Sequence, residues 1–253
     1  MKRNLVRIFM VCLFLCCSCV LKAQLTYGTT GLLNAPSAEM QDSKTVMLGG
    51  NFLNKNITPK PWSYGTYNYY LNFTVFPFLE IAYTATMFKA KTIGGITGMV
   101  DPEKFCNQDR YFSARLRILK EGQFWKHMPA VVLGTSDPYT ESGEDNIATV
   151  EGNGYFSRFY LVASKHFLVG SERIGLHLSC IYNRRIDRRL KGITAGITYT
   201  PSFLPNLRLI AEYDNIDFFV GASYLLSDQL HMQFMLQDFK YPTGGLCYKI
   251  HLK

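Results

Sequence analysis

Apolar and polar residues alternate along most of this chain. In residues 192–200, isoleucine, alanine and tyrosine at odd positions alternate with glycine and threonine at even positions, and residues 172–183 and 229–237 repeat the pattern. Successive side chains of a strand point to opposite faces, so this period of two predicts β-strands. Twelve are predicted, over residues 44–53, 65–76, 79–88, 110–120, 129–136, 155–166, 172–183, 190–200, 206–214, 217–226, 229–237 and 243–252.

The lengths of the strands and of their links favour a membrane barrel. Each strand is close to the ~9–11 residues that cross a bilayer at a barrel's tilt. Links after even strands are mostly short and links after odd strands mostly long, with exceptions at 121–128 and 215–216. We therefore predict an antiparallel transmembrane β-barrel of about 12 strands with both ends in the periplasm. A soluble periplasmic β-sandwich has the same alternation and remains an alternative.

The first residues have the organisation of a secretory leader. Lys2, Arg3 and Arg7 precede an apolar run that ends at Val20, and the small residue Ala23 follows. This order predicts a signal peptide over residues 1–23 that is cleaved near Ala23. A short N-terminal segment, 24–42, and one outer-membrane barrel, 43–253, then remain. Lipidation at Cys19 is the alternative to plain cleavage.

The charge of the chain is moderately basic. Four of the eight net positive charges lie in the predicted leader, which leaves four on the mature chain. A secreted protein does not meet nucleic acid, so acidic polysaccharide or the phosphates of lipopolysaccharide are the better candidate partners. A solvated surface with a slight excess of lysine and arginine explains the same numbers.

Sequence motifs for enzymatic chemistry are missing. The mature chain has no zinc-protease motif, no paired C-x-x-C, no P-loop and no G-x-S-x-G, so we expect no enzyme, no cofactor and no metal site. The histidines are interpreted as wall residues on separate strands: His166, His177, His231 and His251.

Charged residues fall at positions that would point into the barrel if the apolar faces meet lipid. These candidate lumen-lining residues are Arg115, Arg117, Arg208, Glu212, Lys249 and His251. They predict either an internal network of salt bridges or an anion-favouring path. Aromatic residues near strand ends predict a girdle at the headgroup level: Tyr64, Tyr67, Tyr69, Tyr70, Phe76, Phe78, Tyr155 and Phe156.

The last strand carries a candidate insertion signal. Gly245, Tyr248 and Ile250 resemble the carboxy-terminal signal that the bacterial barrel-insertion machinery reads, although the chain ends Leu252-Lys253 rather than on an aromatic residue. We therefore expect that machinery and outer-membrane lipid among the partners, and a location in the outer membrane of a Gram-negative cell.

Five passages resemble, in the same order, YjbH-type outer-membrane proteins associated with exopolysaccharide production: Thr30–Met40, Arg115–Gly122, Pro129–Asp137, Tyr160–Lys165 and Leu207–Asp214. Within the fourth, the signature is Tyr160, Leu161, Val162, Ala163, Ser164 and Lys165. The chain departs from the family pattern at Glu39, where the family has arginine, and at Phe159, where it has an acidic residue.

The resemblance implies a role in exopolysaccharide export or surface assembly, as a conduit or as a structural partner of other export proteins. It provides no catalytic residues to carry over. The alternatives are a general small-solute pore and a barrel-embedded lipid-modifying enzyme.

Overall fold

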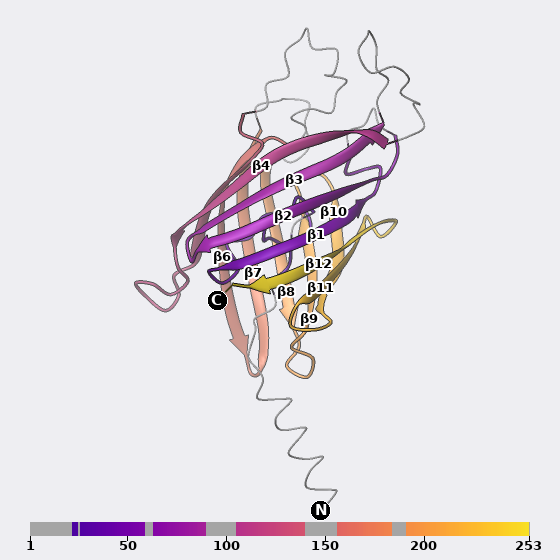
Figure 1. The fold of residues 1–253 in the computed structure, drawn as a ribbon. Coiled ribbons are helices and arrows are strands. Elements are labelled where there is room, and N and C mark those ends of the chain that lie inside the picture. Colours follow the sequence, from indigo (N-terminus) through magenta and orange to yellow (C-terminus); the bar gives the residue numbers. More distant parts are fainter. Residues whose placement is uncertain are drawn as a thin grey trace, which may run out of the picture.

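The described chain forms a closed antiparallel barrel (Figure 1). This computed structural model describes residues 22–24, 26–58, 63–89, 105–139, 156–183 and 191–252. Its strands are β1 (Thr45–Leu53), β2 (Thr66–Phe76), β3 (Leu79–Lys89), β4 (Phe105–Leu119), β5 (Ala130–Ser136), β6 (Arg158–Val169), β7 (Glu172–Tyr182), β8 (Gly192–Thr200), β9 (Leu207–Tyr213), β10 (Phe218–Leu225), β11 (Leu230–Gln237) and β12 (Tyr241–His251). The twelve predicted strands are confirmed.

The sheet closes because the first strand pairs with the last. Every other strand pairs with its neighbours in the sequence, and β1 pairs antiparallel with β12 from Thr45 opposite His251 to Phe52 opposite Gly244. A closed sheet has no strand edge left to pair with another chain. The soluble sandwich considered above is therefore wrong, because a sandwich consists of two separate sheets.

The barrel is apolar outside and polar inside. Ile193 on β8 is 62% exposed and Leu178 on β7 is 57% exposed, whereas Thr194, the residue after Ile193, is 1% exposed. Leucine, isoleucine and phenylalanine project outward all round the sheet, and serine, threonine, asparagine and charged residues project inward. This arrangement inverts that of a soluble protein and matches a wall that faces lipid.

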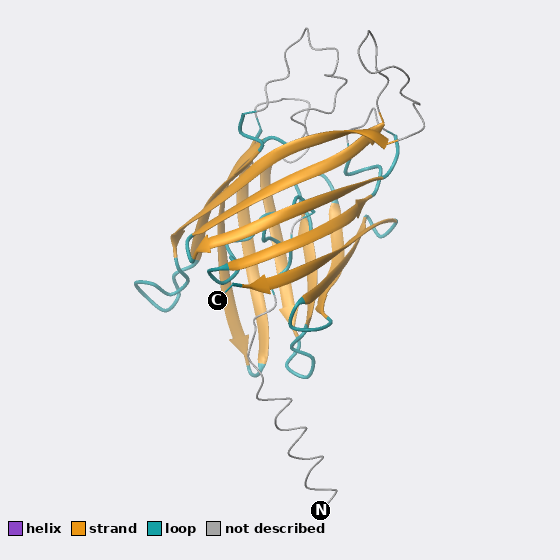
Figure 2. Ribbon diagram, viewed as in Figure 1, coloured by secondary structure: helices purple, strands orange, loops and turns teal. Residues whose placement is uncertain are grey.

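Short links lie at the end of the barrel that carries Lys22 and the carboxyl terminus (Figure 2). Pro77-Phe78 joins β2 to β3, and Gly170-Ser171 joins β6 to β7. We call this end the mouth. Residues 1–21 of the predicted leader (1–23) and most of the long links at the opposite end lie outside the described residues. Among the residues described, no helix is long and apolar enough to cross a membrane.

Two residues of the predicted aromatic girdle belong to the interior instead. Tyr67, Tyr69, Phe76 and Phe78 point outward, but Tyr70 and Phe156 are only 1% and 2% exposed. Tyr70 has the opposite parity from Tyr69 on β2, so it must point into the lumen. Phe156 precedes β6 and packs against the rings of Tyr27 and Tyr111 inside the barrel.

Candidate functional site

The N-terminal segment lies inside the barrel. Every described residue from Ala23 to Gln41 is buried, and Asp42 is the first exposed one. We call residues 22–42 the plug. Its backbone folds back on itself through two isolated bridges, Gln24 with Thr30 and Gly31 with Pro36, and it lies among the strands (Figure 2). The sequence predicts a short segment separate from the barrel, 24–42, but does not indicate that this segment lies in the lumen.

Apolar contacts fit the plug to the wall. Leu32 and Leu33 are fully buried and share an apolar cluster with Ile210 and Phe219 of the strands. On another side, the ring of Tyr27 lies 5.2 Å from that of Phe156. The guanidinium of Arg158 stacks 4.1 Å above the same Tyr27 ring, a cation–π contact that favours this position of the tyrosine.

A carboxylate on β9 binds the turn of the plug. Glu212 accepts hydrogen bonds from three consecutive backbone amides, those of Leu33 (3.0 Å), Asn34 (2.6 Å) and Ala35 (3.1 Å). The Asn34 side chain donates to Asp214 at 2.8 Å. Because β9 ends at Tyr213 on the side away from the mouth, the plug reaches towards the far end of the barrel.

A buried ion pair joins the middle of the plug to β3 and β4. Arg115 donates to Glu80 at 2.9 Å, and neither side chain is exposed. Glu80 also accepts the amide of Thr30 at 2.6 Å, and Arg115 donates to the carbonyl oxygens of Ser37 and Glu39. These additional hydrogen bonds offset the cost of removing both charges from water.

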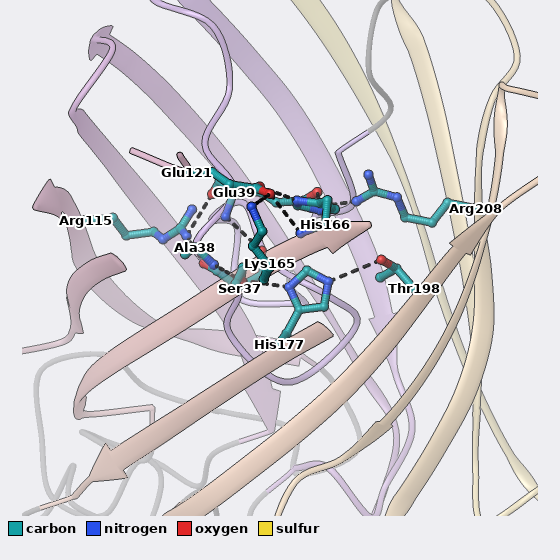
Figure 3. A network of polar contacts seen from close by, with 11 residues as sticks. Ser37, Ala38, Glu39, Arg115, Glu121, Lys165, His166, His177, Thr198 and Arg208 are labelled. Carbon is teal, nitrogen blue, oxygen red and sulfur yellow. Dashed lines mark hydrogen bonds and ion pairs between the residues drawn. The ribbon is translucent and has the colours of Figure 1, made fainter. Parts of the chain in front are cut away.

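Glu39 is the centre of a second network, nearer the mouth (Figure 3). Its carboxylate accepts from Arg208 at 2.6 Å and lies 2.9 Å from Nε2 of His166, whose Nδ1 lies 2.7 Å from Glu121. His166 therefore bridges the plug to the β4–β5 link.

Next to this network, a serine of the wall contacts the plug. Ser164 accepts the amide of Ala38 at 2.7 Å and lies 2.8 Å from Nδ1 of His177, whose Nε2 lies 3.2 Å from Thr198. Ser164 is 1% exposed. A serine beside a histidine can form a nucleophile, but here the serine oxygen is engaged by the plug.

Two acids at the mouth have a lowered pKa. Burial raises the pKa of Glu121, but hydrogen bonds from His166 and Lys165 outweigh it and hold that pKa below its usual value. Burial likewise opposes ionisation of Asp42, and the Lys22 ammonium 3.0 Å away holds the Asp42 pKa below its usual value. Both carboxylates are therefore ionised at neutral pH.

A cavity of about 460 Å³ opens between the plug and the wall at the mouth. The lower plug lines one side with Glu39 and Asp42, and β4, the β4–β5 link and β7 line the other with Arg117, Lys120 and Arg173. Across the described residues, no cluster of three or more histidine, cysteine, aspartate or glutamate side chains is arranged to hold a metal ion.

The sequence matches one family model over residues 23–222, which is most of the chain. That family is YjbH, described as an exopolysaccharide biosynthesis protein. The chain belongs to the YjbH family. No curated protein matches its sequence.

Solved structures similar to this YjbH-family chain are outer-membrane proteins. An outer membrane channel of Pseudomonas putida F1 has 10% identity and a TM-score of 0.41, and the match covers 86% of this chain and 98% of that one. A calcium-bound outer membrane phospholipase dimer of Salmonella typhi has 10% identity and a TM-score of 0.37, with coverage of 83% and 91%. Omp33 of Acinetobacter baumannii has 9% identity and a TM-score of 0.34, with coverage of 83% and 99%.

The candidate lumen residues of this YjbH-family barrel occupy four different positions. Arg115, Arg208 and Glu212 are buried and bind the plug. Arg117 points into the mouth cavity. Lys249 is 9% exposed on the inner wall, while His251 is exposed at the rim, where it contacts Thr45 at 3.1 Å.

The motif that resembles the family, Tyr160–Lys165, lies in β6. Tyr160, Val162 and Ser164 face inward, Leu161 and Ala163 face outward, and Lys165 pairs with Glu121 at 3.0 Å. Ser164 hydrogen-bonds to the plug, and Tyr160 and Val162 share an apolar cluster with the plug residues Ala38 and Met40.

Gly245, which belongs to the predicted insertion signal, also has a packing role. A Cβ atom there would lie 1.9 Å from the Asn51 side chain, so only glycine fits beside β1. Tyr248 and Ile250 point outward on β12, towards lipid.

Sequence reasoning missed Glu39, Glu80, Glu121 and His166 as a connected set. A signal for Glu80 was available, because its predicted strand places it on the same inward face as Ala82 and Thr84, and Arg115 is predicted on the inward face of the next strand. Glu39 had no such signal, since it belongs to a segment without a period.

Proposed function

We propose that this barrel is a closed outer-membrane component that assists exopolysaccharide export or surface assembly as a structural partner of other export proteins. Membership of the YjbH family supports the connection to exopolysaccharide. The single observation that favours a structural partner over an open conduit is the plug, which is buried within the lumen from Ala23 to Gln41.

Barrel size makes the plug decisive. Eight-stranded barrels are filled by their own side chains, whereas barrels of 16–18 strands leave an aqueous channel, and a twelve-stranded barrel lies between them. Here a chain segment occupies that intermediate lumen, and it is bound by buried charged groups on several strands. A general small-solute pore would need this segment to move out of the lumen.

The proposal assigns no enzymatic step to the chain. Ser164 and His177 form the serine–histidine contact described above, and the Ser164 oxygen already accepts the amide of Ala38. The proposal also includes export through a leader that is cleaved near Ala23, with lipidation at Cys19 as the alternative.

Gene deletion tests the proposed role. Deleting the gene and staining surface polysaccharide should reveal reduced or poorly retained polymer, and a plasmid copy should restore it. A strain with an unrelated outer-membrane barrel deleted is the control for general envelope damage. Unchanged polysaccharide in the deletion strain would contradict the role.

A further inference from the structure

The mouth cavity has an excess of unpaired positive charge. Two of its three acids have basic partners on the barrel: Glu39 binds Arg208 and His166, and Glu121 binds Lys165 and His166. The third, Asp42, binds Lys22, which cleavage near Ala23 would remove, so one free acid would then face the free bases. The side chains of three bases lining the same cavity have no hydrogen bond or ion pair to any described residue: Arg117, Lys120 and Arg173.

These three bases converge from different parts of the wall. Arg117 is on β4, Lys120 begins the β4–β5 link, and Arg173 is on β7. Arg117 shares its inward parity with Arg115, and Arg173 shares its own with the buried His177. Both arginines therefore point into the barrel and not towards lipid, so a ligand would reach them from the aqueous space at the mouth.

The chemistry of the cavity selects an anion. A guanidinium presents a planar pair of donors that matches a carboxylate or a phosphate, and a partly buried site strengthens the attraction relative to open water. Gln41 and Ser43 line the same space and can hydrogen-bond to hydroxyl groups. A cavity of about 460 Å³ lies within the range of roughly 300–1,000 Å³ that is typical of small-ligand sites.

We propose that the mouth cavity binds an acidic sugar unit of a polysaccharide, with Arg117, Arg173 and Lys120 binding its anionic group. The choice of a sugar rests on the proposed function, whereas the choice of an anion rests on the cavity itself. The plug forms one wall of this site, so a bound acidic polymer would contact both the wall and the segment that closes the lumen.

Binding to the purified full-length barrel in detergent micelles tests this site. The probes are tetragalacturonate as a carboxylate sugar, glucose 6-phosphate as a phosphate sugar and maltotetraose as a neutral sugar. We expect an acidic sugar to bind and maltotetraose not to bind. Arg117→Gln and Arg173→Gln should each weaken binding about tenfold, the effect expected of one lost charge-assisted hydrogen bond.

Two matched variants control for folding and for net charge. Lys240→Gln removes one positive charge at an exposed position in the β11–β12 link, away from the mouth, and should leave binding unchanged. Arg117→Lys retains the charge and should recover part of the affinity. A gel that compares boiled and unboiled samples shows whether each variant still forms the barrel.

Several outcomes would overturn the inference. It fails if neither acidic sugar binds, if the Arg117→Gln/Arg173→Gln double variant binds as well as the wild type, or if acetate and inorganic phosphate compete as strongly as the sugars. Tighter binding of polyglutamate than of tetragalacturonate would indicate an acidic protein segment instead. If the deletion strain has altered polysaccharide but the barrel binds no acidic sugar, the proposed site is rejected and the proposed function is retained. If the barrel binds acidic sugar but the deletion strain has unchanged polysaccharide, only the proposed function is rejected.

Discussion

Single residues on the inner wall decide whether the plug fits. A Cβ atom at Gly196 would lie 2.3 Å from Cδ1 of Leu32, and one at Gly221 would lie 2.9 Å from Cδ1 of Leu33. Gly221 is also restricted by its own sheet, because the same Cβ would lie 2.2 Å from the carbonyl oxygen of Phe234. Gly196 is therefore the residue that the plug alone requires to be glycine.

Substitution of these glycines should distinguish a clash with a plug side chain from a clash with the backbone of the sheet. Gly196→Ala overfills the contact with Leu32 and should destabilise the folded barrel by about 1–3 kcal/mol. In a Leu32→Ala background the same glycine substitution should cost much less, because the Cδ1 atom of Leu32 that is in conflict is absent there. Gly221→Ala should not be restored by Leu33→Ala, since a backbone carbonyl remains in the way. The measurement is the temperature at which the unboiled gel band converts to the unfolded one; equal rescue of both glycine variants would contradict this account.

The link residue Glu121 should make stability depend on pH. Its pKa is lowered in the folded barrel, so its contribution is fully present above its ordinary pKa and is lost as the pH falls through the lowered pKa. At pH 7, Glu121→Gln should lower the unfolding temperature by about 2–4 °C, the shift that roughly 1 kcal/mol produces in a chain of this size.

The same comparison at pH 3 provides the control for the Glu121 prediction. As the pH is lowered from 7 to 3, the unfolding temperatures of the wild type and of Glu121→Gln should approach each other, because protonation of the carboxylate removes part of its contribution to stability. Gln123→Ala on the same link tests a neighbouring position without a charge. A difference of equal size at both pH values would mean that the carboxylate charge is not the cause.

At the scale of elements, the described residues of the plug form no helix or strand, and the wall accepts hydrogen bonds from several of their backbone amides in addition to those that the plug makes within itself. Buried amides need acceptors. Glu212 of β9 supplies them to three consecutive amides that include Asn34, Glu80 of β3 supplies one to Thr30, and Ser164 of β6 supplies one to Ala38. Strands with widely separated positions in the sequence thus bind one short segment.

Removing the plug should turn the closed barrel into a pore. We expect replacement of residues 26–39 by a Gly-Ser linker to raise single-channel conductance in planar bilayers at least tenfold, while boiled and unboiled samples still migrate differently. The reason is that the strands pair with one another without plug residues. The control is the unmodified barrel, purified and measured in parallel. Unchanged conductance would mean that side chains of the wall close the lumen.

At the scale of the whole molecule, the strands could be predicted from sequence and the plug could not. A period of two indicates which face of a strand is apolar, and this pattern can be recognised without knowing which strand is its neighbour. In this barrel the apolar face is the outer one. The plug has no period, and its position depends on contacts that span up to 180 residues, such as that between Asn34 and Asp214. The buried placement of Arg115 follows from parity, but its partner Glu80 required the register of β3 against β4.

The route of the chain through the mouth determines how the plug can move. Lys22 pairs with Asp42 at 3.0 Å, so the plug enters and leaves at the same end. Because both ends of the plug lie at the mouth, the segment can enter the lumen after β1 has paired with β12 and can withdraw without breaking any strand pairing. Barrel assembly and plug docking are thus topologically independent events.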